Sequence, residues 1–260
     1  MNRIVILVIA LLLACAGCRP APAPEMRVLF VGNSLTYVGN VPAVYAALAT
    51  ANGHPTHSDM IVRGGATLSQ RVADGSVARA LADGDYAVLV LQERGGDLMC
   101  GFGPDACEES RDAIAALVAL ATKHGTRTVL LGTYQPGPAA SKRLVDAESA
   151  AAQAAGITYV EISETLAGLR TRHPDLAWFD ADGMHPGREL ALLNAVKLHR
   201  AIHGEPAAPA ALSVVAPIYA PRSGLQESLR AADAPPPLPD TPARADYPRE
   251  ILQILLAPGA

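Results

Sequence analysis

Residues 26–36 read MRVLFVGNSLT, and this stretch decides the fold of the chain. Its first half is apolar apart from Arg27 and ends at Gly32, which is typical of a strand buried on both faces. Such strands occur in parallel sheets that helices cover on either side. The segment therefore predicts an α/β domain in which a short polar turn directly follows the first strand.

Strands and helices are predicted to alternate along the rest of the chain. The further strands are expected at residues 58–62, 86–91, 128–131 and 157–160, and the helices at 40–53, 68–81, 111–124, 139–155, 163–171 and 186–204. Parallel neighbours need crossover connections, which helices provide. We therefore expect a three-layer α/β/α sandwich around a parallel five-stranded sheet, formed by residues 26–204.

Composition excludes several classes of protein. The chain has 260 residues, of which 50% are apolar and 18% charged, so it is not disordered and can form one core of ordinary size. Its 21 Lys and Arg residues against 25 Asp and Glu residues give a net charge of -4. No basic excess is available for nucleic acid, so nucleic acid is not an expected partner.

The N-terminus predicts export. Residues 1–18 combine Arg3 with an apolar run at 4–13 that is short for a membrane span, as in a signal peptide. Small residues precede Cys15 and Cys18, as in the lipobox of bacterial lipoproteins. Cys18 is the favoured lipidation site, with Cys15 and an ordinary cleaved signal peptide as alternatives. Residues 19–25 form a Pro-rich linker, so we expect a protein of the periplasm or cell envelope, in contact with the membrane only through a lipid anchor.

An exported chain favours disulfides, and Cys100 and Cys107 are predicted to pair across a glycine-containing loop. A metal site is the competing interpretation. It is disfavoured because two cysteines without a nearby histidine leave a tetrahedral site half empty. Beyond Gly204, residues 205–260 form an Ala- and Pro-rich extension, in which 251–255 are a candidate short helix.

Polar motifs stand where the predicted strands end or the last helix begins, and ligands of open α/β sheets collect at the carboxyl ends of the strands. The motifs are GNSLT at 32–36, GGAT at 64–67, QE at 92–93 and DGMHP at 182–186. A hydroxyl, backbone amides, a side-chain amide and an acid–histidine pair are the parts of an acyl-transfer site.

The roles follow from elementary chemistry. A serine hydroxyl such as that of Ser34 needs an imidazole to take its proton, and His185 is the candidate base. Asp182, three residues earlier, can hold the imidazole in one tautomer; Asp180 is a less favoured alternative. An oxyanion needs preorganised donors, which the backbone amides of Ser34 and Gly65 and the side-chain amide of Gln92 would supply. Other polar residues near predicted strand ends are candidates for contacting a leaving group, namely Arg63, Arg94 and Tyr134.

In order and spacing, these motifs resemble the four blocks of the GDSL/SGNH hydrolase superfamily, over residues 26–204. The resemblance implies a flavodoxin-like fold, with Ser34 as nucleophile, His185 as base, Asp182 as its partner and Gly65 as an oxyanion donor. Two blocks depart from the family's pattern. The third should end in Gly-x-Asn-Asp, but residues 90–93 read VLQE, which puts Gln92 in the place of Asn; the first reads GNSL where GDSL is usual.

The sequence thus predicts a serine esterase that acts through an acyl-Ser34 intermediate and needs neither metal nor organic cofactor. Because the chain is expected to be exported, small acyl groups such as acetyl on carbohydrate are the expected substrates, either as small molecules or in a polysaccharide. Lipid or thioester substrates, and transfer of the acyl group to a sugar hydroxyl, are alternatives. The alternative is a carbohydrate-binding accessory lipoprotein of the cell envelope with weak or no activity, since the altered third block would impair catalysis. The sequence predicts no particular oligomeric state.

Overall fold

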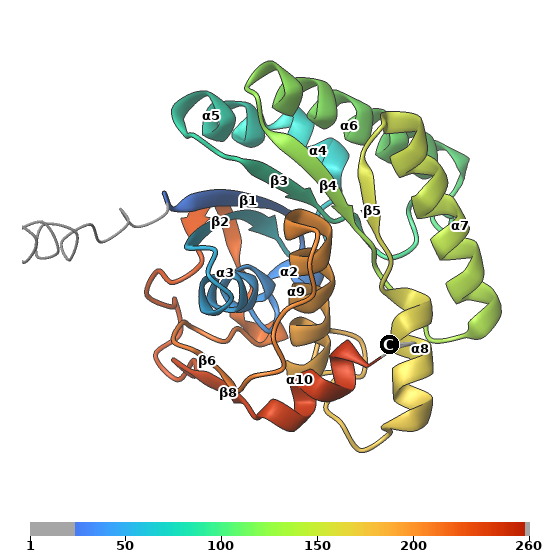
Figure 1. The fold of residues 1–260 in the computed structure, drawn as a ribbon. Coiled ribbons are helices and arrows are strands. Elements are labelled where there is room, and N and C mark those ends of the chain that lie inside the picture. Colours follow the sequence, from blue (N-terminus) through green and yellow to red (C-terminus); the bar gives the residue numbers. More distant parts are fainter. Residues whose placement is uncertain (1–23, 258–260) are drawn as a thin grey trace, which may run out of the picture.

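A computed structural model describes residues 24–257 and shows a mostly parallel central sheet between layers of helices (Figure 1). The strand order is β5-β4-β3-β1-β2-β7. The strands are β1 (Met26–Gly32), β2 (Thr56–Arg63), β3 (Val88–Leu91), β4 (Arg127–Leu131), β5 (Thr158–Val160) and β7 (Gln226–Ala231). The predicted α/β sandwich is confirmed, but the sheet has six strands instead of five.

The central strand β1 pairs with β2 on one side and with β3 on the other. Its side chains alternate between the two layers, as the pleat of a strand requires. Val28 and Phe30 belong to the core cluster beneath α3 (Val41–Ala51) and α9 (Arg188–His203). Leu29 and Val31 belong to the cluster of the opposite face. This double burial explains the uninterrupted apolar run in the sequence.

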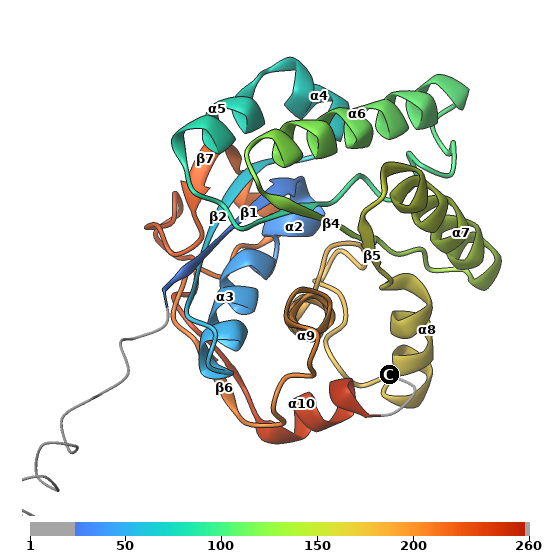
Figure 2. The same ribbon diagram turned by 45° about the horizontal axis from the view of Figure 1, so that its top comes forward.

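Helices cover both faces of the sheet (Figures 1 and 2). One face carries α4 (Leu68–Ala73), α5 (Ser76–Asp83), α6 (Pro104–Lys123) and α7 (Pro138–Ala155). The other carries α2 (Ser34–Tyr37), α3, α8 (Ser163–Arg172) and α9. Two predicted boundaries were wrong. The expected helix at 68–81 is broken at Gly75, which has a φ of +68°, and α6 begins at Pro104, seven residues earlier than expected.

Residues after Gly204 pack on the domain and complete its sheet. Strand β7 pairs antiparallel with β2 at the sheet edge. The short strands β6 (Leu212–Val214) and β8 (Ala245–Tyr247) pair with one another near α3, and η1 (Pro221–Ser223) lies between β6 and β7. The candidate helix at 251–255 is present as α10 (Arg249–Leu256), which packs against α9. The additional strand of the sheet thus comes from the extension.

The predicted disulfide between Cys100 and Cys107 is confirmed, and it joins the loop after β3 to the first turn of α6. Within residues 24–257, no helix has the length and apolar character needed to cross a bilayer. The predicted signal peptide, Cys15, Cys18 and most of the linker lie outside the described residues.

Candidate active site

Ser34 lies at the carboxyl end of the central strand. It is the first residue of α2, and the side chain of Asn33 before it accepts a hydrogen bond of 3.0 Å from the amide of Leu35. The chain leaves β1 toward β2 on one side, whereas β3 lies on the other, so this is the point where the strand order reverses. Such switch points are where open α/β sheets bind their ligands.

The turn at Ser34 is packed so closely that it leaves no room for a side chain at Gly32. A Cβ atom at Gly32 would collide with the hydroxyl of Thr36 and lie 3.1 Å from the carbonyl oxygen of Gln92. The glycine therefore lets the end of β1 approach its neighbours, which fixes the direction in which the turn presents Ser34.

Asp182 and His185 lie on a loop that folds back on itself before α9. Phe179 and Pro186 form a β-bridge at its base, and the amide of Asp180 donates to the carbonyl oxygen of His185 over 2.9 Å. His185 Nδ1 and Asp182 Oδ2 are 2.5 Å apart. The predicted acid–histidine pair is therefore formed within this loop.

Asp182 is also anchored to the backbone of the loop. Its Oδ1 accepts hydrogen bonds of 2.9 Å from the amides of Met184 and His185. Partial burial raises the pKa of Asp182, but the hydrogen bonds from His185 and Met184 outweigh this effect and lower the pKa to about 2. The carboxylate is thus ionised at neutral pH. Asp180 instead accepts a hydrogen bond from the amide of Ala181, so the imidazole has Asp182 as its partner.

Three predicted site residues from distant parts of the chain border one pocket of about 510 Å³. Ser34, Gly65 and His185 line it, together with residues of the loops after β3 and β4. Gly65 has a φ of +68°, in the left-handed region that glycine adopts without strain. The pocket therefore has a hydroxyl, an imidazole and an exposed backbone turn on its wall.

Gln92 does not reach this pocket. Its side chain is buried, its Oε1 accepts a hydrogen bond of 2.7 Å from the hydroxyl of Thr36, and its Nε2 donates to the carbonyl oxygen of Gly132 over 3.3 Å. Both ends of the amide are thus used beneath the turn that carries Ser34. The expected role of Gln92 as third oxyanion donor does not agree with this geometry.

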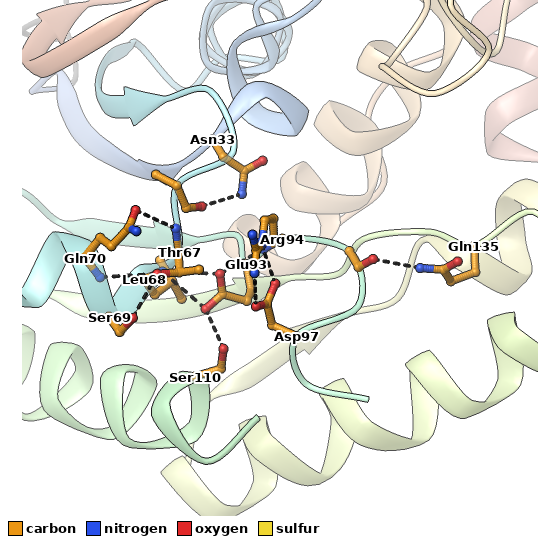
Figure 3. Close-up of polar contacts among 12 residues, drawn as sticks. Asn33, Thr67, Leu68, Ser69, Gln70, Glu93, Arg94, Asp97, Ser110 and Gln135 are labelled. Atoms are coloured by element: carbon orange, nitrogen blue, oxygen red, sulfur yellow. Dashed lines mark hydrogen bonds and ion pairs between the residues drawn. The ribbon is translucent and has the colours of Figure 1, made fainter. Parts of the chain in front are cut away.

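The loop of Gly65 is tied to the turn of Ser34 and is capped at its far end (Figure 3). Asn33 Nδ2 donates to the carbonyl oxygen of Ala66 over 3.2 Å. Thr67 begins α4 with a capping box, in which its hydroxyl accepts from the amide of Gln70. The two segments that would supply the oxyanion donors are therefore held in a fixed relation to one another.

Glu93 belongs to the motif at 92–93, but the sequence predicted no role of its own for it. Its carboxylate accepts hydrogen bonds from the amides of Leu68 and Arg94 and from the hydroxyl of Ser110 on α6 (Figure 3). Burial raises the pKa of Glu93, as does the nearby Asp97, and the hydrogen bonds oppose the shift, leaving a pKa of about 7. One buried carboxyl group thus joins α4, α6 and the end of β3.

Other predicted contacts have mixed outcomes. Arg94 and Tyr134 line the pocket, as expected near strand ends. Arg63 does not line it and instead forms a hydrogen bond with Gln70.

The sequence missed the apolar residues of the pocket wall, which are Phe102, Phe179 and Met184. Phenylalanine is scarce in the chain, at three residues, and two of them line this pocket, so this scarcity was a usable signal. Among residues 24–257, no His, Cys, Asp and Glu cluster is arranged to hold a metal ion.

No protein-family model and no curated protein matches the chain. Solved structures do match it. TesA covers 67% of this chain and 98% of its own length, with a TM-score of 0.53 and 21% identity. A lipase/acylhydrolase from Enterococcus faecalis covers 70% and 99%, with a TM-score of 0.53 and 13% identity. A catalytic mutant of Axe2, an acetylxylan esterase from Geobacillus stearothermophilus, covers 68% and 91%, with a TM-score of 0.51 and 14% identity. The chain therefore has the fold of the GDSL/SGNH hydrolases.

Proposed function

We propose that the chain is a serine esterase whose nucleophile is Ser34. One observation carries the proposal: Ser34, Gly65 and His185 border a single pocket at the switch point of the sheet, and His185 is paired there with Asp182. The neighbours of similar fold are esterases and acylhydrolases, which supports the hydrolysis of ester bonds.

The reaction begins when Ser34 Oγ attacks the ester carbonyl carbon and passes its proton to Nε2 of His185. Asp182, ionised and bonded to Nδ1, stabilises the imidazolium that results. The imidazolium then gives the proton to the departing alcohol oxygen as the ester C–O bond breaks. Water, deprotonated by the same imidazole, attacks the acyl-Ser34 carbonyl, and the acid leaves while Ser34 recovers its proton.

The negative oxygen of each tetrahedral intermediate accepts hydrogen bonds from the backbone amides of Ser34 and Gly65. Two fixed amides are effective because they need not reorganise when the charge develops. The hydrogen bond from Asn33 to Ala66 supports this arrangement, since it joins the two segments. No metal or organic cofactor enters any step.

We also propose that the protein is exported and anchored through Cys18, so that it meets ester substrates in the periplasm or cell envelope. Location alone favours acetyl groups on polysaccharide as substrates, and the lining of the pocket is a separate indication of which acyl groups fit. The position of Gln92 away from the pocket favours a second candidate, an accessory lipoprotein that binds carbohydrate and has little activity. A measurement of ester hydrolysis by the purified protein distinguishes the esterase from the binding protein.

The test uses purified protein with p-nitrophenyl acetate and with an organophosphonate. We expect hydrolysis, and we expect the phosphonate to be found on the peptide that contains Ser34. Ser34→Ala is expected to lose roughly 10⁴-fold or more of kcat. Ser228→Ala, which removes an exposed hydroxyl from β7, is the matched control and should keep full activity. A protein that is inert toward esters but retained by polysaccharide supports the binding module.

A further inference from the structure

The pocket beside Ser34 has a wall of aromatic and apolar side chains. Phe102, Tyr134, Phe179 and Met184 all line it. Phe102 and Met184 are 60% and 58% exposed, and they are two of only five large apolar side chains left exposed among residues 24–257. Exposed apolar side chains that gather at one concave place mark a binding surface.

Two polar groups of the same wall are already hydrogen-bonded within the protein. The hydroxyl of Tyr134 donates to the carbonyl oxygen of Met184 over 2.7 Å. Gln135 Nε2 donates to the carbonyl oxygen of Gly95 over 2.8 Å (Figure 3). A sugar ring needs partners for each hydroxyl that it buries, since an unpaired hydroxyl costs free energy. This part of the wall offers a sugar few partners and offers an alkyl chain many contacts.

Phe102 is held in place although its ring is exposed. It lies between Cys100 and Cys107, which the disulfide joins, and the guanidinium of Arg94 lies 4.2 Å from the centre of its ring. Arg94 is itself fixed by two hydrogen bonds to the buried carboxylate of Asp97, of 2.9 and 2.6 Å. A fixed apolar side chain binds a ligand without first losing conformational entropy.

Another part of the wall is also fixed. The rings of Tyr134 and Phe179 lie 5.5 Å apart, and the guanidinium of Arg170 covers Phe179 at 4.8 Å from the centre of its ring. Phe179 belongs to the loop that carries His185, so this side of the pocket is built together with the base. The apolar space therefore lies directly beside the groups that attack the ester.

We propose that this pocket binds the acyl part of the substrate and that the preferred substrates are esters of apolar acyl groups longer than acetyl. The inference rests on the proposed esterase function. An acetyl group would leave most of the roughly 510 Å³ to water, whereas a hexanoyl chain would bury its methylenes against Phe102 and Met184. The apolar acyl chain, and not a sugar ring, occupies the apolar part of the pocket that Phe102 and Phe179 line.

The test is the dependence of kcat/KM on chain length, measured with p-nitrophenyl acetate, butyrate, hexanoate and octanoate. Each methylene that becomes fully buried is expected to raise kcat/KM by up to about fourfold. We therefore expect hexanoate to exceed acetate by roughly tenfold or more. Acetylated xylan, assayed with the same preparation, should be a poorer substrate than the hexanoate ester.

Two substitutions locate the effect. Phe102→Ala and Met184→Ala are each expected to lower the ratio of hexanoate to acetate kcat/KM by about fivefold. Phe102→Leu, which keeps an apolar side chain of similar reach, should retain most of the ratio. Leu229→Ala removes an exposed apolar side chain from β7, outside the pocket, and should leave the ratio unchanged. Thermal unfolding of each variant confirms that it is folded.

The outcomes separate this inference from the proposed function. Activity that is highest with acetyl esters, or a chain-length preference unaffected by Phe102→Ala and Met184→Ala, overturns the inference and leaves the esterase standing. A folded protein that hydrolyses none of the esters and does not react with the phosphonate overturns both.

Discussion

Thr36 donates its hydroxyl hydrogen to Oε1 of Gln92 over 2.7 Å, which ties the turn of Ser34 to the residue after β3. Nε2 of the same amide reaches the carbonyl oxygen of Gly132, just beyond β4. Gln92 is 1% exposed and has both ends of its amide engaged. It therefore joins the ends of neighbouring strands beneath the site and supports the nucleophile from below.

Gln92→Leu is expected to destabilise the protein by about 1–3 kcal/mol, because the hydroxyl of Thr36 and the carbonyl of Gly132 lose a buried partner. The value of kcat should fall by less than about tenfold, since Gln92 does not contact the oxyanion. Urea unfolding and the hydrolysis of one p-nitrophenyl ester measure the two effects. An oxyanion donor would show the reverse: a loss of roughly 10²- to 10³-fold in kcat with stability unchanged.

Asp182→Asn is expected to lower kcat by roughly 10²- to 10⁴-fold, because an amide neither fixes the tautomer of His185 nor stabilises its charged form. The change is nearly isosteric, so KM and thermal stability should change little. Steady-state kinetics near pH 8 measure the loss.

Asp180→Asn is the matched control, since Asp180 lies in the same loop and its carboxylate accepts from the backbone of Ala181. It should retain activity within about threefold of the unchanged protein. If the two substitutions had their effects exchanged, Asp180 would be the partner of His185 and the geometry of the loop would have to differ from that described.

The parallel strands could be predicted because a strand buried on both faces has an apolar sequence. The candidate site residues could be predicted because polar motifs follow these strands or precede the last helix, as Ser34 and His185 do. Strand β7 was missed for a physical reason. This strand lies at the sheet edge with most of its residues exposed or half-buried, so its sequence, QESLRA, contains no apolar run. Edge strands are specified by their neighbour more than by their own pattern.

The orientation of Gln92 could have been read from strand periodicity. Val88 and Val90 belong to one core cluster, and Leu89 and Leu91 to the other. Continuing the alternation directs Gln92 to the face of Val90, and Glu93 to the face of α4 and α6, as observed. The apolar wall of the pocket offered no such pattern, because its residues come from loops whose path depends on tertiary packing and on the disulfide.

Glu93 is expected to make stability depend on pH. Its pKa is raised to about 7 in the folded protein, against about 4.3 in an unfolded chain. Between these values the folded state binds a proton that the unfolded state has lost, so the contribution of Glu93 to the free energy of unfolding falls as pH rises from about 4.5 to about 7. Glu93→Gln removes this titration, and urea unfolding at a series of pH values should show a shallower decrease.

Glu148 contributes to the same pH dependence of stability, so its replacement belongs in the same experiment. It too is buried, which raises its pKa to about 7 against the hydrogen bonds from Thr133 and Tyr159. Glu148→Gln should therefore also make the decrease shallower, and the double variant more so than either alone. If the slope of Glu93→Gln equalled that of the unchanged protein, Glu93 would be ionised throughout this range.

A histidine cluster at the end of α9 is expected to act in the opposite direction. The rings of His54 and His203 stack with centres 3.8 Å apart, and that of His199 lies 4.7 Å from His203. Burial, together with the charges of His54, His199 and Arg127, lowers the pKa of His203 to about 4, against the opposing effect of Glu205. Nε2 of His203 also contacts the hydroxyl of Tyr45 at 3.2 Å. The surroundings of His203 thus favour its neutral form.

As pH falls from about 6.5 to about 4, the unfolded chain binds a proton at His203 that the folded protein does not bind, so the contribution of His203 to the free energy of unfolding decreases. His203→Gln should reduce this decrease, measured by urea unfolding between pH 4.5 and pH 7. His124→Gln, at the exposed end of α6, is the control and should not alter it. Since Glu93 changes stability in the opposite sense over the same range, combining His203→Gln with Glu93→Gln should restore a pH dependence close to that of the unchanged protein. An acid-side slope that His203→Gln leaves intact would show that His203 is protonated in the folded state at pH 5, in conflict with its burial.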